Sequence, residues 1–325
     1  MQGIERPAAA LLLLLLSACT RVPDRPLKVG TNPWAGSEPL YLARELGLYP
    51  TTQPIHLVEF TSAHQLARAF RNGVIDAAAV PLIEVLRFES LGQHPRVVMM
   101  LDSSHGADCL LARPEVESLA ALKGKRVGHA GVSSTHYMLG RLGERAGLVP
   151  EDLHEVILPL EAQEGALVRN RVDAVLTSAP YCARLLATGL HSLFDSSEIP
   201  GELVDVIIVR EEYLASHPDQ VDGLLRGWFD ALAHYRAQPE QDARRMAPRL
   251  GLDAEHFQKS LLGMRLADEH EQRLHLLGEQ PQLRETLERL GTMLARPQAL
   301  GPPVDAARLV DTEALTRVLA GRGHP

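Results

Sequence analysis

The stretch GADCLLA, residues 106–112, decides how this chain is organised. It is an apolar, extended segment, whereas the apolar segments on either side of it alternate with helices. A break of this kind indicates that one strand–helix series ends and a second begins. A second apolar extended segment, VDVIIV at 204–209, has the same character. We therefore predict that the chain crosses to a second lobe near 103–110 and returns near 202–208.

Short apolar strands alternate with helices on both sides of residues 106–112. Before this stretch, strands are expected at 27–31, 55–60, 77–80 and 97–101, and helices at 38–48, 65–70 and 81–89. After it, strands are expected at 125–129, 154–158 and 174–176, and helices at 134–146, 162–168 and 179–187. Continuous apolar strands separated by helices are typical of a parallel sheet covered on both faces.

The part of the chain from about Glu211 onward is predicted to be helical. Apolar residues from Val221 to Leu232 recur on one helical face, which places Trp228 in the core. The sequence thus predicts an α/β fold of two Rossmann-like lobes joined by a two-strand hinge. The first lobe, with the C-terminal helices, is assigned residues 27–105 and 206–325, and the second lobe residues 106–205. Small ligands bind in clefts between domains, so a ligand site is expected between the lobes.

Composition excludes several classes of protein. The 325 residues include 33 Lys plus Arg and 41 Asp plus Glu, giving a net charge of −8, and 45% are hydrophobic. These values are typical of a globular protein and unlike those of disordered or fibrous chains. The acidic balance argues against a non-specific nucleic-acid binder, which needs a basic face.

The N-terminus is predicted to be an export signal. The apolar segment at 8–16 is too short to span a bilayer, which needs about 20 residues. The sequence LSAC at 16–19 resembles the bacterial lipoprotein box, in which the cysteine, here Cys19, is lipidated and becomes the first mature residue. We therefore assign residues 1–18 to a lipoprotein signal peptide and 19–26 to a tether. An ordinary signal peptide with a chance cysteine is the alternative.

Two further cysteines, Cys109 and Cys182, lie among apolar residues. Their surroundings predict two small buried thiols. A disulfide between them, which the oxidising conditions outside the cytoplasm permit, is the alternative.

No catalytic, cofactor or metal signature is present in the sequence. It lacks Cys-x-x-Cys, His-Glu-x-x-His, a phosphate loop and Gly-x-Ser-x-Gly. The 14 histidines are scattered, and most are expected to be solvated. We therefore expect a protein that is not an enzyme and that holds no cofactor and no metal.

The loop after the first strand, NPWAGSE at 32–38, is the first candidate for ligand contact. Ligands of open α/β sheets bind beyond the carboxyl ends of the strands. Trp34 offers an apolar wall or a cation–π face there, the alternative being that it packs on its own lobe. Glu38 either contacts the ligand or only complements the dipole of its helix.

The loop GVSST at 131–135 is the second candidate, because hydroxyl groups and free backbone N–H groups at a helix start form an anion site. Simple N-capping is the alternative. Polar groups where the chain leaves the first lobe either face the ligand or bind hinge backbone groups, and an acid on the returning strand adds a charge for a ligand amine. The predicted ligand contacts are Asn32, Trp34, Glu38, Ser104, His105, Ser133, Ser134, Thr135, Ser178 and Asp205.

Residues 27–48, LKVGTNPWAGSEPLYLARELGL, resemble the opening of ABC-importer substrate-binding proteins of the nitrate/sulfonate/taurine class, which has thiamine-precursor-related members. Further matches follow in order at GAD (106–108), LKGKRVG (122–128) and WFDAL (228–232). The resemblance implies a periplasmic binding protein fold of type II, with a cleft that closes on its ligand. Similar sequences usually carry an aromatic residue at the position of Ser37, and this departure implies a roomier or more polar pocket.

The resemblance also implies a function, namely that of a lipid-anchored, periplasmic solute-binding component of an ABC importer. The expected solute is small and polar, with a sulfonate or taurine-like zwitterion favoured over a simple anion. The expected partners are this solute, the permease subunits and, through the lipid anchor only, the membrane; the protein is expected to be a monomer that binds no nucleic acid. A ligand-sensing lipoprotein and an enzyme resembling those of pyrimidine-precursor synthesis are the alternatives.

Overall fold

The computed structural model describes residues 25–278, 281–294 and 305–322. The predicted signal peptide and the predicted lipidation site Cys19 lie outside these residues. Among the described helices, none combines the length and the apolar character that a membrane crossing requires.

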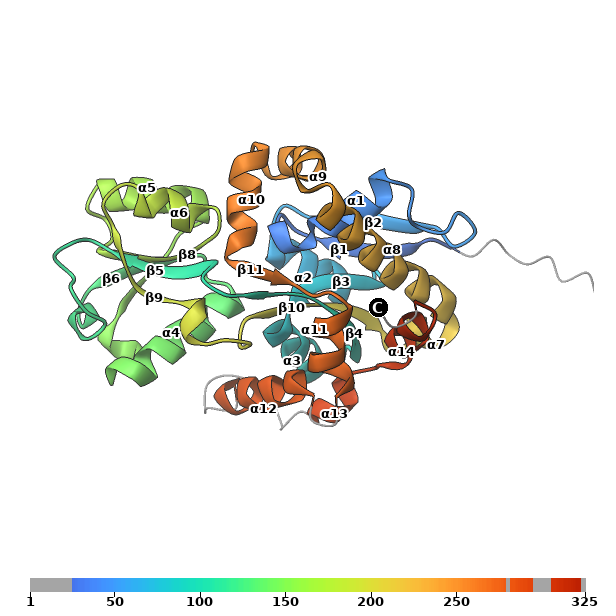
Figure 1. Cartoon of the computed structure of the whole chain (residues 1–325). Helices are drawn as coiled ribbons and strands as arrows, with labels where there is room; N and C mark the ends of the chain where they lie inside the picture. Colours follow the sequence, from blue (N-terminus) through green and yellow to red (C-terminus); the bar gives the residue numbers. More distant parts are fainter. Residues whose placement is uncertain (1–24, 279–280, 295–304, 323–325) are drawn as a thin grey trace, which may run out of the picture.

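The first sheet has six strands in the order β11-β4-β10-β3-β1-β2 (Figure 1). Its members are β1 (Leu27–Thr31), β2 (Ile55–Glu59), β3 (Ala77–Pro81), β4 (Pro95–Ser104), β10 (Val204–Arg210) and β11 (Met264–Leu266). Strand β1 pairs in parallel with β2 and β3, whereas β10 lies antiparallel between β3 and β4. Its apolar strands are almost fully buried, as the continuous apolar sequence predicted.

The second sheet has five strands in the order β7-β6-β8-β5-β9. Its members are β5 (Asp108–Ala112), β6 (Arg126–His129), β7 (His154–Ile157), β8 (Ala174–Ser178) and β9 (His191–Asp195). Strand β5 lies antiparallel between β8 and β9, as β10 does between β3 and β4. Each sheet therefore receives one strand from the chain segment that has just crossed over from the other sheet.

Helices cover both sheets. They are α1 (Glu38–Glu45), α2 (Ala63–Arg71), α3 (Leu82–Ser90), α4 (Ser133–Ala146), α5 (Leu160–Val168), α6 (Tyr181–Leu186), α7 (Glu211–Ser216), α8 (Pro218–Ala237), α9 (Pro239–Met246), α10 (Ala254–Leu262), α11 (Glu269–Gln272), α12 (Gln282–Leu294), α13 (Ala306–Leu309) and α14 (Glu313–Ala320). In the second lobe α5 and α6 lie on one face of the sheet and α4 on the other (Figure 1). The expected two α/β lobes are thus confirmed.

Two details of the C-terminal part test the predictions made for it. Trp228 is fully buried and its indole N–H donates to the carbonyl oxygen of Ala267 at 3.0 Å, which confirms its place in the core. The expectation that everything after Glu211 is helical is wrong at β11, which pairs with the end of β4. A strand of three residues is too short to show a period in the sequence.

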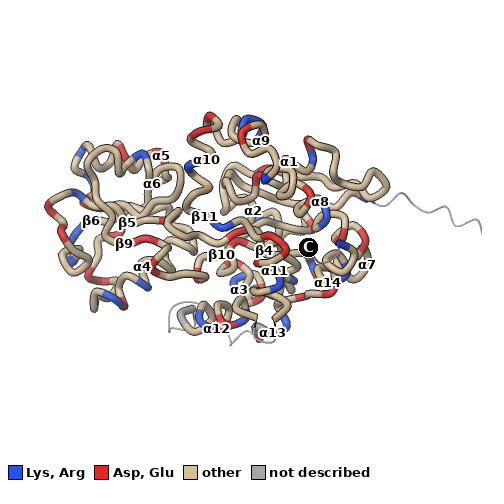
Figure 2. The backbone as a smooth tube through the Cα atoms, viewed as in Figure 1, with Lys and Arg blue, Asp and Glu red and all other residues tan. Residues whose placement is uncertain are grey.

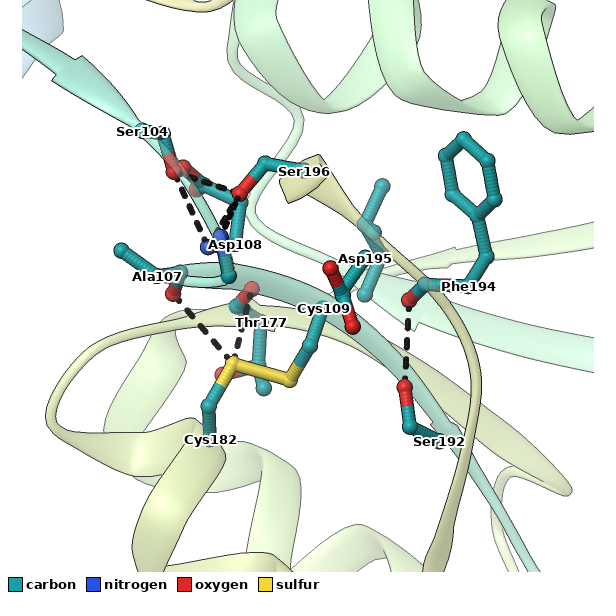
Figure 3. The surroundings of a disulfide bond; sticks show 12 residues. Ser104, Ala107, Asp108, Cys109, Thr177, Cys182, Ser192, Phe194, Asp195 and Ser196 are labelled. Atoms are coloured by element: carbon teal, nitrogen blue, oxygen red, sulfur yellow. Dashed lines mark hydrogen bonds between the residues drawn. A yellow bond between two sulfur atoms is a disulfide. The ribbon is translucent and has the colours of Figure 1, made fainter. Parts of the chain in front are cut away.

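The prediction of two free thiols is also wrong, because Cys109 of β5 and Cys182 of α6 form a disulfide (Figure 3). Helix α6 packs against β5, and this contact brings together two cysteines that are 73 residues apart in the sequence. The Sγ atom of Cys182 lies 3.3 Å from the carbonyl oxygen of Ala107. A disulfide sulfur carries no hydrogen, so this approach is a packing contact.

Charged residues of both signs are distributed over both lobes, as Figure 2 shows. This mixed surface agrees with the modest net charge of −8.

Candidate functional site

The two lobes meet at a region that we call the lobe junction. It comprises the segment from β1 to the start of α1 (residues 32–38), the crossing from β4 to β5 (102–108), the start of β10 (204–205), the segment from β6 into the first turn of α4 (130–135) and the segment from the end of β8 to the start of α6 (178–181). The backbone N–H of Ala179 donates to the carbonyl oxygen of Ala107 at 2.7 Å, which joins the last of these segments to the crossing. All ten predicted ligand contacts lie in or beside the lobe junction.

The two crossing segments are fastened to each other. The hydroxyl of Ser196, just after β9, lies 2.7 Å from the hydroxyl of Ser104 and accepts from the backbone N–H of Gly106 at 2.7 Å (Figure 3). The backbone N–H of His105 donates to Gly263, next to β11, at 2.7 Å. Ser104 and the His105 backbone thus satisfy hinge groups, which was one of the two roles considered for them.

A second network surrounds Glu202, a buried acid on the returning crossing. Its carboxylate accepts from the Tyr137 hydroxyl at 2.7 Å and from the Arg141 guanidinium at 2.7 Å, both on α4. It also accepts from Arg289 of α12 at 2.6 Å. Glu202 therefore links a helix of the second lobe to a C-terminal helix of the first.

Three acids gather where the crossings join the first sheet, and we call Asp102, Asp108 and Asp205 the carboxylate cluster. Strand register places Asp205 of β10 directly opposite Asp102 of β4, so their side chains lie on one face. Burial raises the pKa of Asp102 to about 7 and that of Asp108 to about 6. Burial and the charges of the other two acids raise the pKa of Asp205 as well. Such a cluster favours protons or a bound cation.

Trp34 is hydrogen-bonded to one acid of this cluster. Its indole N–H donates to Oδ2 of Asp102 at 3.0 Å, and the ring packs in an apolar cluster that includes Ala107 of the crossing and Phe257 of α10. A Cβ atom at Gly36 would lie 1.8 Å from Oδ2 of Asp102, so only glycine allows the loop to approach the acid this closely. The indole is thereby held at the lobe junction beside the acids.

Glu38 lies at the end of the lobe-junction segment 32–38, but its partners belong to the first lobe. It is fully buried, and its Oε2 accepts from Nε of Arg249 at 3.1 Å. Arg249 also lies over the Tyr41 ring and donates to Glu59 at 2.6 Å. Burial still raises the pKa of Glu38 to about 7, despite the arginine. Glu38 therefore already has a cationic partner within the protein.

The loop before α4 faces the first lobe. The Ser133 hydroxyl donates to Glu84 and accepts from Nη1 of Arg87 at 2.8 Å, and both partners belong to α3. Thr135 is buried and donates to the carbonyl oxygen of Val132 at 2.7 Å. Helix α4 has no side-chain N-cap, since Val132 occupies that position.

The remaining predicted contacts are half-buried. Ser134 lies in the first turn of α4, and Asn32 follows β1. Ser178 ends β8 and pairs with Asp108 of the carboxylate cluster. The lobe junction thus contains an acidic side near Trp34 and, near α4, a side with hydroxyl, N–H and guanidinium donors beside the carboxylate of Glu84.

The sequence placed Asp102 in the polar stretch where the chain leaves the first lobe but did not select it as a ligand contact, and it selected neither Asp108 nor Arg87. A charged residue at the start of the otherwise apolar stretch at 106–112 was the available signal for Asp108. The sequence offers no signal for Arg87, because this residue lies on an ordinary amphipathic helix.

A hollow of about 510 Å³ lies elsewhere, at the turn between α8 and α9. Exposed residues line it, namely Gln238, Pro239, Glu240, Gln241 and Arg244. It contains none of the predicted contacts, and we assign it no role.

Comparison with known proteins gives two curated relatives. The chain is 26% identical over 261 residues to a putative aliphatic sulfonates-binding protein of Escherichia coli K12, a match that covers 78% of this chain and 81% of the relative. It is 26% identical over 186 residues to the taurine-binding periplasmic protein of the same organism, covering 56% and 58% of the two chains.

Solved structures share the fold. The periplasmic aliphatic sulphonate-binding protein of Escherichia coli superposes with a TM-score of 0.74 at 22% identity, covering 88% of this chain and 97% of that one. The desulfurization enzyme DszB also superposes, with a TM-score of 0.69 at 18% identity and coverage of 92% and 100%, so the fold alone does not separate binding proteins from enzymes.

The predicted fold, a periplasmic binding protein fold of type II, is confirmed by the strand order of both sheets and by these structures. The predicted class is confirmed as well, since the curated relatives are sulfonate-binding and taurine-binding proteins and not enzymes. The sequence model of the NMT1-like family matches residues 20–251, which is well over half of the sequence, and the chain therefore belongs to the NMT1-like family.

Proposed function

We propose that this protein is the extracytoplasmic solute-binding component of an ABC importer, and that it captures a small zwitterion of the sulfonate or taurine type between its lobes. The names of the two curated relatives support the solute class. The observation that carries the choice of a zwitterion is the carboxylate cluster beside Trp34. A simple anion would gain nothing from these acids.

The ammonium group of the solute binds at the carboxylate cluster. Each acid there has a raised pKa, so each is poorly stabilised as an anion without a positive partner. An ammonium group supplies that charge, and the face of the Trp34 indole offers a cation–π contact beside it.

The anionic group of the solute binds near the start of α4. A helix N-terminus without a side-chain cap presents free N–H donors and a positive dipole end. Arg87 lies at the same helix start, with its guanidinium 2.8 Å from the Ser133 hydroxyl, and it is paired with Glu84 at 3.1 Å, so the anionic group of the ligand competes with Glu84 for this guanidinium. The ammonium end of a zwitterion therefore meets the carboxylate cluster, and its anionic end meets the N–H donors of α4 in the second lobe.

Titration calorimetry with taurine and with propane-1-sulfonate tests this proposal, because the second compound replaces the ammonium group with a methyl group of similar size. We expect taurine to bind more tightly, and we expect Asp205→Asn to remove most of that preference. A variant with Glu240→Gln, an exposed acid outside the lobe junction, serves as the control. If wild type binds both compounds equally, or if nitrate binds best, the zwitterion assignment is wrong.

The proposal includes export and anchoring through residues 1–26. Lipidation of Cys19 would hold the protein at the membrane surface as a monomer that meets the permease. Cys19→Ala should release the protein from the membrane fraction or block its processing. The Asp205→Asn variant, which keeps Cys19, is the control and should fractionate with membranes like the wild type. Membrane fractionation unchanged in Cys19→Ala would contradict the anchor and leave the solute assignment standing.

A further inference from the structure

We propose that the second lobe carries a binding site for one divalent transition-metal ion such as Zn²⁺, formed by His129, His136 and Glu155. One ligand atom from each of these residues lies within 4.8 Å of the other two. Imidazole nitrogens and a carboxylate oxygen are the donor set that Zn²⁺ accepts in sites that keep a position open to water.

The fold brings the three side chains together. Register between β6 and β7 pairs Val127 with Glu155, and His129 lies two residues beyond Val127 on the same strand. Alternate residues of a strand share a face, so the side chains of His129 and Glu155 point the same way. His136 comes from α4, which follows β6 and covers this face of the sheet. Three separate rigid elements therefore hold the donors.

The distances between donor atoms suit a metal. Nε2 of His129 lies 2.8 Å from Oε2 of Glu155, and Nε2 of His136 lies 3.8 Å from the same oxygen. Neighbouring donors around a tetrahedral Zn²⁺, with bonds of about 2.0–2.1 Å, are roughly 3.3 Å apart. The two observed distances bracket this value, and small side-chain rotations bring both to it. The rings meet edge to face with centroids 5.1 Å apart, which lets both Nε2 atoms turn toward one point.

His136 already has the bonding pattern of a metal ligand. Its Nδ1 lies 3.0 Å from the carbonyl oxygen of Val132, which assigns the ring hydrogen to Nδ1. The Nε2 atom then presents a lone pair toward the Glu155 carboxylate, an arrangement that a cation between the two atoms stabilises. In metal-bound histidines the N–H of the other ring nitrogen characteristically donates a hydrogen bond to a carbonyl or carboxylate oxygen in this way.

His129 must shift one hydrogen to bind the ion. Its Nδ1 accepts from the backbone N–H of Gly131 at 3.1 Å, so in the metal-free protein the hydrogen is on Nε2 and is shared with Glu155. Metal binding at Nε2 moves this hydrogen to Nδ1, where the hydroxyl oxygen of Thr135, 3.4 Å away, accepts it. No proton is gained or lost in this exchange. Metal binding therefore breaks the hydrogen bond from the backbone N–H of Gly131 to His129, and it changes the contacts of residues 130–135.

Solvent can reach the site. His129 is fully buried, whereas the side chains of His136 and Glu155 are 53% and 33% exposed. The buried histidine fixes the position of the ion, and the two exposed ligands leave room for water as a further ligand.

Calorimetry with Zn²⁺ on the untagged, EDTA-stripped chain tests the proposal. We expect one ion per chain, and at least a tenfold loss of affinity in His136→Ala and in Glu155→Gln, because even residues that only support metal ligands cost 10–100-fold when removed. His154→Ala is the matched control, since His154 precedes Glu155 on β7, is exposed and is not one of the three proposed ligands. Thermal unfolding without metal checks that each variant is folded.

Two results would overturn the proposal: no saturable binding of Zn²⁺ to the wild-type chain, or binding that the His136 and Glu155 variants retain in full. Substitution with Co²⁺ gives a second readout, because four-coordinate Co²⁺ has a strong visible absorption that should vanish in His136→Ala and persist in His154→Ala. The taurine titration is separate, so failure of either assignment leaves the other open to its own test.

Discussion

Replacing Asp102 with asparagine distinguishes two effects of the carboxylate cluster, namely its destabilisation of the folded protein and its contribution to ligand affinity. Asparagine has nearly the same shape, and its side-chain oxygen can still accept from the Trp34 indole N–H, which donates to Asp102 at 3.0 Å. The substitution removes one buried charge that acts against Asp205. We expect the ligand-free protein to become more stable at neutral pH and its affinity for taurine to fall.

The size of the gain follows from the raised pKa. The pKa of Asp102 is about 7 in the folded protein, against an ordinary value of 3.8. Three units at about 1.4 kcal/mol each set an upper limit of about 4 kcal/mol. Because the folded state binds the proton of the Asp102 carboxyl more tightly than the unfolded state, protonation favours folding. This contribution to the free energy of unfolding is complete below pH 3.8 and is lost as the pH rises through 7. The asparagine variant suffers no such loss.

Urea unfolding of both proteins at pH 5 and pH 8 measures the difference. The advantage of Asp102→Asn should be about 2–3 kcal/mol larger at pH 8 than at pH 5. Asp173→Asn is a control of opposite sign, since the Arg126 guanidinium holds the pKa of Asp173 down to about 2. Partial exposure screens that pair, so its loss should destabilise by only about 1 kcal/mol, equally at both pH values. An equal gain for Asp102→Asn at both pH values would refute the reasoning.

Three further changes test other features of the structure. The double variant Cys109→Ser with Cys182→Ser should lose about 2–4 kcal/mol of unfolding free energy, as expected for a long closed loop, and unchanged unfolding would contradict the disulfide. Gly36→Ala should break the bond between Trp34 and Asp102 and shift Trp34 fluorescence, with buried Trp228 as internal reference; an unchanged spectrum would show that the loop accommodates the methyl group. Trp34→Ala should weaken taurine binding by about 1–3 kcal/mol in calorimetry, and wild-type affinity would exclude the indole from the site.

The fold was largely predictable because its main signals are local. Strand β3 is a short apolar run with a helix after it, and at each crossing two strands follow one another without an α-helix between them, β4 and β5 at the first and β9 and β10 at the second. Strand β9, HSLFD, was missed because it is a short edge strand of mixed polarity. Only Phe194 of β9 is buried, so its sequence shows no continuous apolar run.

The site was less predictable because its contacts depend on partners far along the chain. The loop with Trp34 could be placed, since strand ends of a parallel sheet meet at one edge. The bond between Ser133 and Arg87 could not, because it requires knowing that α3 and α4 face each other across the lobes. The ion pair between Glu38 and Arg249 is equally non-local, because the two residues are far apart in the sequence.

The position of the carboxylate cluster gives a reason why the protein keeps acids that oppose its folding. Asp102 lies two residues before the end of β4, Asp108 begins β5 and Asp205 is the second residue of β10, so all three lie on the segments that join the lobes. Destabilising, buried titratable groups concentrate at functional sites, where their cost is offset by what they bind. If a ligand ammonium group neutralises these acids, it reduces repulsion within the hinge itself. We therefore expect ligand charge, and not only ligand shape, to determine how the two lobes are held relative to each other.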